Sequence, residues 1–406
     1  MSRDVGSDGW QRNVWALSLS VFIAFVGFQF FSPFLPLYVR ELGVTDPARI
    51  ALWSGLIAAV TPAVSGLLSP LFGRLADRFG RKMMLIRSLA GFTVIIAAMG
   101  LVTSVQQLFL VRLIMGLFAG FTPMAMALAS ISAPRDRAST AIARVQGAQL
   151  LSVVVGPAVG GTVASHVGIR PAFYVTAAMC VVALIALIFL FRETGALERG
   201  DRRTPVRSVP LTEFLRYPHF IPVMLLLLVA QFIDRALSLL VPLHVAHMPG
   251  IEAAAISGLI ISVAAVGATV SASAAARLSQ IVPVGRLLLG QLLVGGMFCA
   301  LMAVAERPGP LLVLRTVVAL CLGGALTLAY TLGGMIVPAE TRGAAFGWLA
   351  LGVQIGTAAS PLLNGWLAGA SVPRAYVMNG VLAWVAAALL AFGARGLVDR
   401  RERDEG

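Results

Sequence analysis

Four charged side chains lie inside long apolar stretches of this sequence, where a charge is expensive and usually has a function. They are Arg112, Asp234, Arg235 and Arg315, and Asp234 is the one acid among them. A carboxylate whose arginine partner can move away can bind and release a proton. We therefore predict proton binding at Asp234, with a permanent Asp234–arginine ion pair that joins two helices as the alternative.

Other polar side chains accompany Asp234 at helical spacing, and a similar set recurs in the first half of the chain. Residues three and four apart share one face of a helix, so both sets are expected to point toward a common centre. Arg112 and Arg315 are expected to face the same cavity. The second-half set is Gln231, Arg235 and Ser238, and the first-half set is Gln29 and Ser32.

Twelve apolar segments must hold these residues in place. Of the 406 residues, 58% are hydrophobic and 12% are charged, and the mean hydropathy is +0.89, whereas a soluble domain carries about 25% charged residues. Spanning a bilayer takes about 20 apolar residues, and backbone groups in lipid must be paired within the protein, so the segments must be helices. The predicted spans are 14–39, 51–72, 83–102, 108–133, 141–166, 171–191, 220–245, 253–275, 286–305, 311–337, 344–369 and 375–394.

The basic residues indicate how the chain sits in the membrane. The net charge is +13, and most of the 31 Lys and Arg residues fall in the terminal segments and in the connectors on the same side. Cytoplasmic segments carry such an excess, so both termini are predicted to be cytoplasmic. Topology and anionic lipid head groups account for this charge, and no nucleic-acid partner is expected.

The two halves of the chain repeat each other. The longest charged connector, residues 192–217, separates residues 1–191 from residues 218–406, and each half holds six spans. Matching segments recur at an offset of about 203–206 residues. Parallel repeats with a substrate site between them are a transporter architecture. The matched pairs are residues 34–39 and 240–245, Arg112 and Arg315, and residues 156–161 and 360–365.

The connector after the second span carries a specific motif. Residues 73–82, GRLADRFGRK, closely resemble the loop 2–3 motif of the major facilitator superfamily. This resemblance implies the major facilitator fold, an all-α polytopic membrane protein with 12 transmembrane helices in two pseudo-symmetric six-helix bundles.

The same resemblance implies a conformational latch, with a plain basic loop as the alternative. In the latch, Asp77 meets the start of the eleventh span near residues 342–344, and Arg78 pairs with Asp136. Asp77 and Arg81 would also share a face if the loop begins as a helix. The latch residues are Gly73, Asp77, Arg78, Gly80, Arg81 and Asp136.

Two further stretches resemble family motifs. Residues 108–116 are similar to the fourth-helix motif, which implies that Arg112 is the coupling arginine. The fifth span resembles the motif of drug:proton antiporters, although Ala143 and Ser152 stand where further glycines are usual. The motif is expected to act as a rigid hinge that seals the cavity against proton leak, and close backbone packing by its glycines is the alternative. Its residues are Gly147, Gly156, Pro157, Gly160 and Gly161.

Within the family the chain resembles the twelve-helix bacterial multidrug exporters. The predicted function is secondary transport in a bacterial cytoplasmic (inner) membrane, with proton antiport driving the export of small amphipathic compounds by alternating access. A proton symporter that imports a nutrient is the first alternative, and a membrane-embedded lipid-modifying enzyme is the second. Three arginines against one aspartate inside the spans favour neutral, zwitterionic or anionic substrates.

No cofactor and no metal are expected. Cys180, Cys299 and Cys321 lie singly in separate spans, and no G-x-x-x-x-G-K-[ST] nucleotide-binding motif occurs. The expected partners are a small-molecule substrate, protons and membrane lipids, and the chain is expected to be a monomer. The histidines are expected to be interfacial residues near span ends: His166, His219, His244 and His247.

Overall fold

Long apolar helices account for nearly all of the described chain. The computed structural model describes residues 7–134, 137–191, 211–214, 216–217, 219–338 and 341–393. The first-half helices are α1 (Ser7–Phe30), η1 (Ser32–Phe34), α2 (Leu35–Glu41), α3 (Pro47–Phe79), α4 (Arg81–Leu101), α5 (Val105–Gly116), α6 (Phe121–Ser132), α7 (Ala138–Val167) and α8 (Ile169–Leu190). The second-half helices are α9 (Leu211–Phe214), α10 (Phe220–Val245), α11 (Ala253–Leu278), α12 (Val284–Leu301), η3 (Met302–Val304), α13 (Pro308–Leu322), α14 (Ala325–Ile336), α15 (Arg342–Ala370), α16 (Val372–Ala388) and the π-helical η4 (Leu389–Gly393).

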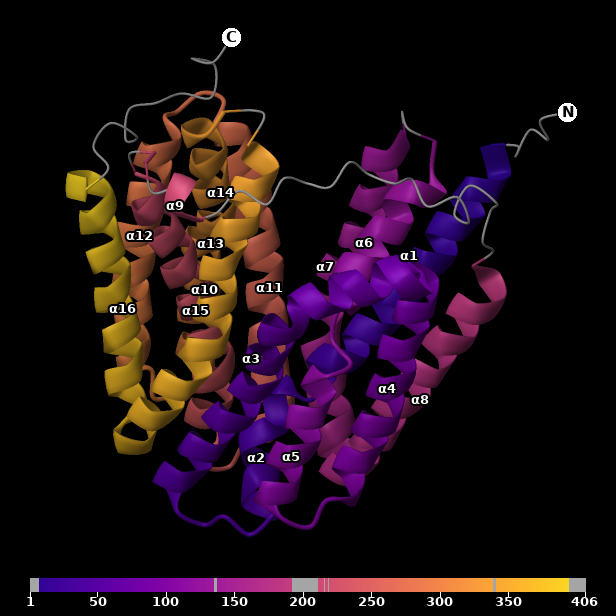
Figure 1. Ribbon diagram of the computed structural model, residues 1–406. Helices are drawn as coiled ribbons and strands as arrows, with labels where there is room; N and C mark the ends of the chain where they lie inside the picture. Colours follow the sequence, from indigo (N-terminus) through magenta and orange to yellow (C-terminus); the bar gives the residue numbers. More distant parts are fainter. Residues whose placement is uncertain are drawn as a thin grey trace, which may run out of the picture.

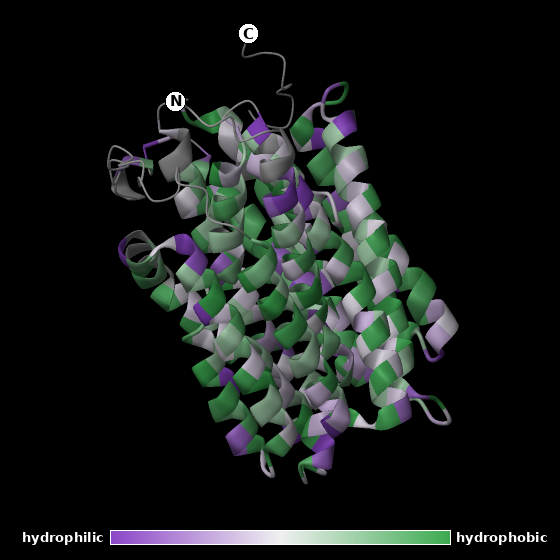
Figure 2. Ribbon diagram, turned by 90° about the vertical axis from the view of Figure 1, so that its right-hand side faces the viewer, coloured by the Kyte–Doolittle hydropathy of each residue, from purple (hydrophilic) through white to green (hydrophobic). Residues whose placement is uncertain are grey.

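These helices cross a membrane twelve times within the described residues. Eleven helical segments are long and apolar enough to span a bilayer. The twelfth crossing is the stacked pair α5 and α6, each of which has 12 residues and is too short to cross alone. Hydrophobic residues dominate the flanks of the molecule, and hydrophilic residues gather toward its two ends (Figure 2). The predicted all-α polytopic fold is therefore confirmed.

Three crossings are interrupted, although the sequence predicted continuous spans. α1 ends at Phe30 and continues as a 3₁₀ turn with Pro33 at its start, because proline cannot donate the backbone hydrogen bond that an α-helix needs. α5 and α6 are separated by a turn in which Gly120 has a left-handed backbone, with φ of 99°. The tenth crossing is also interrupted, at residues 323–324 between α13 and α14, but there both glycines keep right-handed backbone angles.

The motif between the second and third crossings is helical apart from one glycine. α3 continues to Phe79, and α4 begins at Arg81. Gly80 joins the two helices with φ of 85° and ψ of 146°, a conformation that is open essentially to glycine alone. Asp77 and Arg81 therefore lie on different helices, so the predicted shared face of these two residues is wrong.

Gly80→Ala is expected to lower stability by about 1–3 kcal/mol, because a side-chain-bearing residue is strained in this backbone region. Space does not limit the substitution, since nothing lies within 4 Å of a Cβ at this position. Gly347→Ala is the matched control: its site inside α15 is equally open, and alanine should gain about 0.5–1 kcal/mol there. Apparent melting temperatures in detergent should thus move in opposite directions, and a shift of the same sign would show that Gly80 is not a conformational requirement.

The helices form two bundles that stand side by side (Figure 1). α1 to α8 surround one hydrophobic core, and α9 to α16 surround two adjoining clusters. Most of the predicted linker, residues 192–217, lies outside the described residues. Within it, α9 places the buried Phe214 ring against Phe220, with 5.2 Å between the ring centroids.

The two bundles meet at one end of the molecule. We call the end at which α1 begins and η4 ends the inner end, and the opposite end the outer end. α3 packs on α15, and α7 packs on α11, near the outer end. Toward the inner end the two groups of helices diverge (Figure 1).

Candidate functional site

Asp234 forms an ion pair with an arginine of the same bundle. Its Oδ1 lies 3.8 Å from Nη2 of Arg315, which joins α10 to α13. The Asp234 side chain is 55% exposed, whereas that of Arg315 is only 8% exposed. The carboxylate is thus accessible, and the guanidinium is held in the bundle interior.

The polar residues predicted to accompany Asp234 lie on α10, and their exposure differs. The Ser238 hydroxyl donates to the Asp234 carbonyl oxygen at 3.1 Å, Arg235 is exposed and Gln231 is buried. In the first bundle, Gln29 and Ser32 are half-buried. Among the described residues no hydrogen bond or ion pair joins these two to Asp234 or Arg315.

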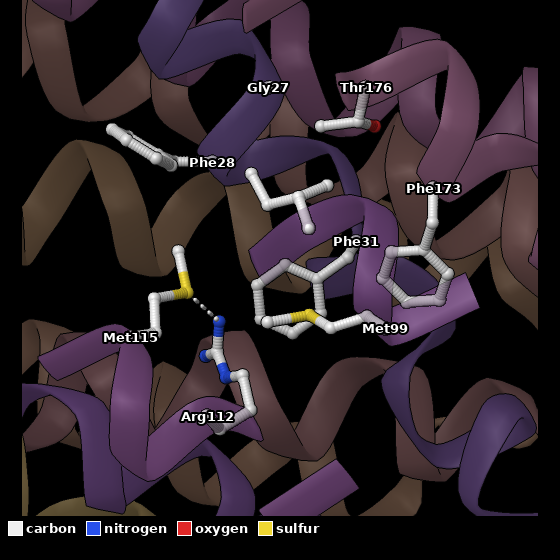
Figure 3. A pocket seen from close by; sticks show the side chains of 9 residues that line it. Gly27, Phe28, Phe31, Met99, Arg112, Met115, Phe173 and Thr176 are labelled. Atoms are coloured by element: carbon white, nitrogen blue, oxygen red, sulfur yellow. Dashed lines mark hydrogen bonds between the residues drawn. The ribbon is translucent and has the colours of Figure 1, made fainter. Parts of the chain in front are cut away.

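Arg112 lies in a small apolar hollow of the first bundle (Figure 3). Its side chain is buried, with the guanidinium carbon 4.2 Å from the ring centroid of Phe31. Nη1 lies 3.5 Å from the Met115 sulfur, and Nε donates to the Ile57 carbonyl oxygen at 3.5 Å. In the described part of the chain, no carboxylate forms an ion pair with Arg112. The hollow is lined by Gly27, Phe28, Phe31, Ile96, Met99, Arg112, Met115, Phe173 and Thr176.

The internal repeat places a polar site in the second bundle where the first has this apolar hollow. Three residues that line the hollow have repeat equivalents 203 positions further along the sequence. Arg112 corresponds to Arg315, Phe173 to Tyr376 and Thr176 to Asn379. All three second-half residues are buried. Two halves of one fold therefore offer different chemistry at equivalent places, aromatic and thioether groups in one and hydroxyl, amide and ion pair in the other.

The fifth-span motif lies at the contact between the bundles. The Pro157 carbonyl oxygen occupies the space where Gly258 of α11 would carry a side chain, and Gly161 meets Ala254 in the same way. The backbone N–H of Ala158 donates to the Ser262 hydroxyl at 2.9 Å. Pro157 and Gly161 are four residues apart and so share the helix face toward α11.

The repeat equivalent of this contact joins the other two helices. On α15, Pro361 and Gly365 face Gly55 of α3, and Gly365 also meets Ala51. At each contact the absence of side chains lets two backbones touch, the feature that allows close helix packing in membranes. The outer end is thus closed by two pseudo-symmetric pairs of helices.

A second face of the motif packs within the first bundle. Gly156 meets Val26 and Gln29 of α1, and Gly160 meets the backbone of Phe30. Gly147 is different, because nothing lies within 4 Å of a Cβ placed there. The prediction that Gly147 permits close backbone approach is therefore wrong.

The latch motif is only partly described. Gly73 and Asp77 belong to α3, the surroundings of both residues are outside the part that the structure describes, and Asp136 lies outside the described residues altogether. Arg78 is exposed, with its guanidinium carbon 5.4 Å from the Phe79 ring centroid. Gly80 and Arg81 form the junction of α3 and α4. The contact of Asp77 with the start of the eleventh crossing and the pairing of Arg78 with Asp136 both stay predictions.

Sequence reasoning missed a polar group near the outer end of the second bundle. His244, expected at an interface, has a ring nitrogen with no solvent contact, and its ring centroid lies 5.6 Å from that of Tyr376. Nδ2 of the buried Asn379 donates to Oδ1 of Asn364 at 2.6 Å. The internal repeat contained the signal, since His244 aligns with Tyr38.

The described ranges contain no cluster of side chains suited to binding a metal ion. No group of three or more His, Cys, Asp or Glu residues gathers there in a way that could hold a metal ion. The three cysteines are free thiols in separate helices.

The architecture and the site together define a polytopic secondary transporter: repeated bundles, a closed outer contact, and one buried arginine at the equivalent place in each bundle. The sequence profile of the Major Facilitator Superfamily matches residues 17–308 and 253–405. The chain belongs to the Major Facilitator Superfamily. It is a transporter and not an enzyme, so the alternative of a lipid-modifying enzyme is wrong.

Curated relatives of the chain are multidrug resistance proteins. It is 30% identical over 388 residues to the multidrug resistance protein MdtG of Salmonella paratyphi A (strain ATCC 9150 / SARB42), with 95% of this chain and 94% of the relative covered. It is 31% identical over 381 residues to MdtG of Dickeya zeae (strain Ech586), with 93% and 92% covered. The predicted relation to bacterial multidrug exporters is confirmed.

Solved structures of other transporters share the fold. A bacterial homolog of the human lysosomal transporter Spinster, in an inward-facing and unoccupied conformation, superposes with a TM-score of 0.79 at 18% identity, covering 98% of this chain and 100% of that one. The nucleoside transporter NupG gives a TM-score of 0.71 at 15% identity, with 92% and 99% covered. At these identities the likeness concerns the fold.

Proposed function

We propose that this transporter exports small amphipathic compounds in exchange for protons, across a bacterial cytoplasmic membrane and with both termini in the cytoplasm. The observation that carries the proposal is the half-exposed Asp234 carboxylate 3.8 Å from the Arg315 guanidinium. A carboxylate with a loosely held partner can exchange that partner for a proton.

The kinds of side chain around Arg112 support recognition of amphipathic compounds. Aromatic rings and methionine sulfur offer a soft, adaptable surface for apolar groups. Arg112, which has no carboxylate partner among the described residues, offers a charge for a polar or anionic end of the same compound. The relatives named as multidrug resistance proteins point to the same class of substrate.

The outer contact supports alternating access. Two pairs of helices close the outer end through small residues, and the bundles diverge toward the inner end (Figure 1). The similar Spinster homolog is in an inward-facing conformation. We propose that this structure is the inward-facing state and that the outer contacts separate in the other state.

Reconstitution into liposomes tests the proposal. A pH gradient is imposed, and lumenal pH is followed while ethidium, as a cationic probe, or anilinonaphthalene sulfonate, as an anionic probe, is added. Antiport predicts that entry of the probe into the lumen is accompanied by exit of protons from the lumen, which discharges a gradient that is acidic inside. Movement of probe and protons in the same direction would instead establish the symport alternative.

A further inference from the structure

Several polar atoms inside the second bundle are buried and have no hydrogen-bond partner among the described residues, and three of them belong to side chains near Asp234 and the outer end. These three are Nε of Arg315, the hydroxyl oxygen of Tyr376 and Nδ1 of His244. Tyr376 is fully buried, and Arg315 is 6% exposed. Native proteins rarely leave such atoms unpaired, and they most often satisfy them with buried water.

These groups follow one another from the outer end to Asp234. His247, exposed at the outer end of α10, lies within electrostatic range of His244. The His244 ring centroid is 5.6 Å from that of Tyr376. Tyr376 lies within electrostatic range of Arg315, whose guanidinium reaches Asp234 at 3.8 Å.

The other groups that face this run are few. The Cys299 thiol of α12 lies within electrostatic range of both Tyr376 and Arg315 and donates to the Tyr376 carbonyl oxygen at 3.7 Å. Nδ2 of Asn379 is bonded to Asn364, while Oδ1 of Asn379 is a fourth buried atom without a partner in the described chain. These polar groups come from α10, α12, α13, α15 and α16, so the run lies within one bundle.

The first bundle has no unpaired polar side-chain atom at the two equivalent positions. Tyr38 aligns with His244, and Phe173 aligns with Tyr376. The Tyr38 hydroxyl donates to the Met99 carbonyl oxygen at 2.5 Å, and its ring centroid lies 5.0 Å from that of Phe173. At this place in the fold, the unpaired polar atoms therefore occur in the second half alone among the described residues.

We propose that water held by these groups forms a proton path through the interior of the second bundle, from His247 at the outer surface to Asp234. The path is separate from the space between the bundles, so substrate and protons reach the exchange site by different routes. This inference rests on the proposed function, in which Asp234 takes up a proton.

The transfer balances at each step. A proton from outer water binds an imidazole nitrogen of His247 and is released to water beside His244. His244 accepts a proton on one ring nitrogen and returns it to water next to Tyr376, whose hydroxyl donates one proton and accepts another. The last water gives its proton to the Asp234 carboxylate, and every carrier is left as it began.

Arg315 closes the inner end of the path in this structure. Its fixed positive charge beside Asp234 repels a hydrated proton, as arginines do in pores that exclude protons. Without this barrier, a half-exposed Asp234 would connect the outer surface with the space between the bundles. Loading of Asp234 therefore requires Arg315 to move away.

The first test measures proton leak without any transported compound. Arg315→Gln in liposomes with a pH gradient is expected to leak protons about tenfold faster than wild type, because the charge barrier is lost. Adding Tyr376→Phe to the same chain should return the leak to the wild-type rate. Arg112→Gln, the repeat equivalent, is the matched comparison and should not create a leak, since the first bundle has no unpaired polar side-chain atom at the two equivalent positions. A tight Arg315→Gln variant, or a leak that Tyr376→Phe leaves unchanged, would overturn the path.

The second test needs no variant and so does not depend on folding of the mutants. Hydroxyl radicals generated by radiolysis of water label buried side chains that touch bound water. Tyr376 is expected to be labelled in the wild-type protein, whereas the equally buried but hydrogen-bonded Tyr38 is expected to stay unlabelled. Equal protection of both tyrosines would overturn the path. Neither test uses a substrate, so failure here leaves the antiport assay to decide the proposed function independently.

Discussion

Asp234→Asn is expected to reduce proton-driven transport to the level of empty liposomes. Asparagine keeps the size of aspartate and one acceptor oxygen but can neither carry a charge nor exchange a proton. In the same vesicles, exchange of labelled for unlabelled probe at equal pH should continue, because that exchange requires no net proton movement. The measurement is lumenal pH and probe flux in parallel.

Glu41→Gln is the matched control for this substitution. Glu41 also forms an exposed carboxylate–arginine pair between two helices, with 3.1 Å between its Oε1 and Nε of Arg170. Both side chains are about as exposed as that of Asp234. Loss of an exposed pair costs little, so Glu41→Gln should transport like wild type.

Two outcomes would contradict the role of Asp234. If Asp234→Asn keeps proton-driven transport, the Asp234–Arg315 pair is a structural contact and coupling resides elsewhere. If the variant loses probe exchange together with proton coupling while remaining folded, Asp234 acts in substrate binding and not in proton exchange. Size-exclusion chromatography and melting temperature establish folding in both cases.

The membrane crossings could be predicted because lipid imposes a simple rule on sequence. A crossing needs a long apolar block, and such blocks are visible in residues 14–39 or 220–245 without any tertiary information. The breaks inside crossings were not visible in this way. Gly120 and Pro33 interrupt α-helices through local backbone geometry, while hydropathy averages over both.

The candidate site could be predicted in its members but not in its pairing. Asp234, Arg112 and Arg315 could be identified from the sequence because a charged side chain inside a membrane span costs free energy and is usually kept for a function. Which arginine pairs with Asp234 depends on how α10 and α13 pack, and sequence spacing contains no such information. The structure pairs Asp234 with Arg315 and leaves Arg112 beside Phe31.

The glycines of α7 also show that a sequence motif does not by itself predict which residues pack against another helix. Gly147 precedes Gly156 by nine residues, about 2.5 helical turns, so the two glycines point to opposite sides of α7. Gly156 and Gly160 are four residues apart and together face α1. Resemblance to a motif grouped all of these glycines, whereas helix geometry separates Gly147 from the packed faces.

Gly161→Val is expected to shift the transporter away from the state seen here. A side chain at this position would overlap the Ala254 carbonyl oxygen of the other bundle. Overpacking costs about 1–3 kcal/mol, which changes the ratio of two conformations by roughly 5- to 150-fold. Because the contact lies between the bundles, the cost falls on outer closure and not on the folding of either bundle.

Spin labels at the outer ends of α7 and α11 measure this shift. Val167→Cys and Glu252→Cys provide attachment sites, since both positions are exposed. Gly161→Val should lengthen the distances between the labels and slow transport, which needs both states. Gly147→Val is the matched control on the same helix, where a side chain meets open space, and its distances should equal those of the parent.

An unchanged distance distribution in Gly161→Val would mean that the α7–α11 contact does not gate the outer end. The repeat equivalent then distinguishes two explanations. Gly55→Val places a side chain against Pro361 and Gly365 at the α3–α15 contact. A shift in this variant alone would assign closure to α3 and α15, whereas a shift in neither would show that the outer ends stay together throughout the transport cycle. Equal shifts in Gly161→Val and Gly55→Val are the expected result, because pseudo-symmetric contacts between two rigid bundles must open together.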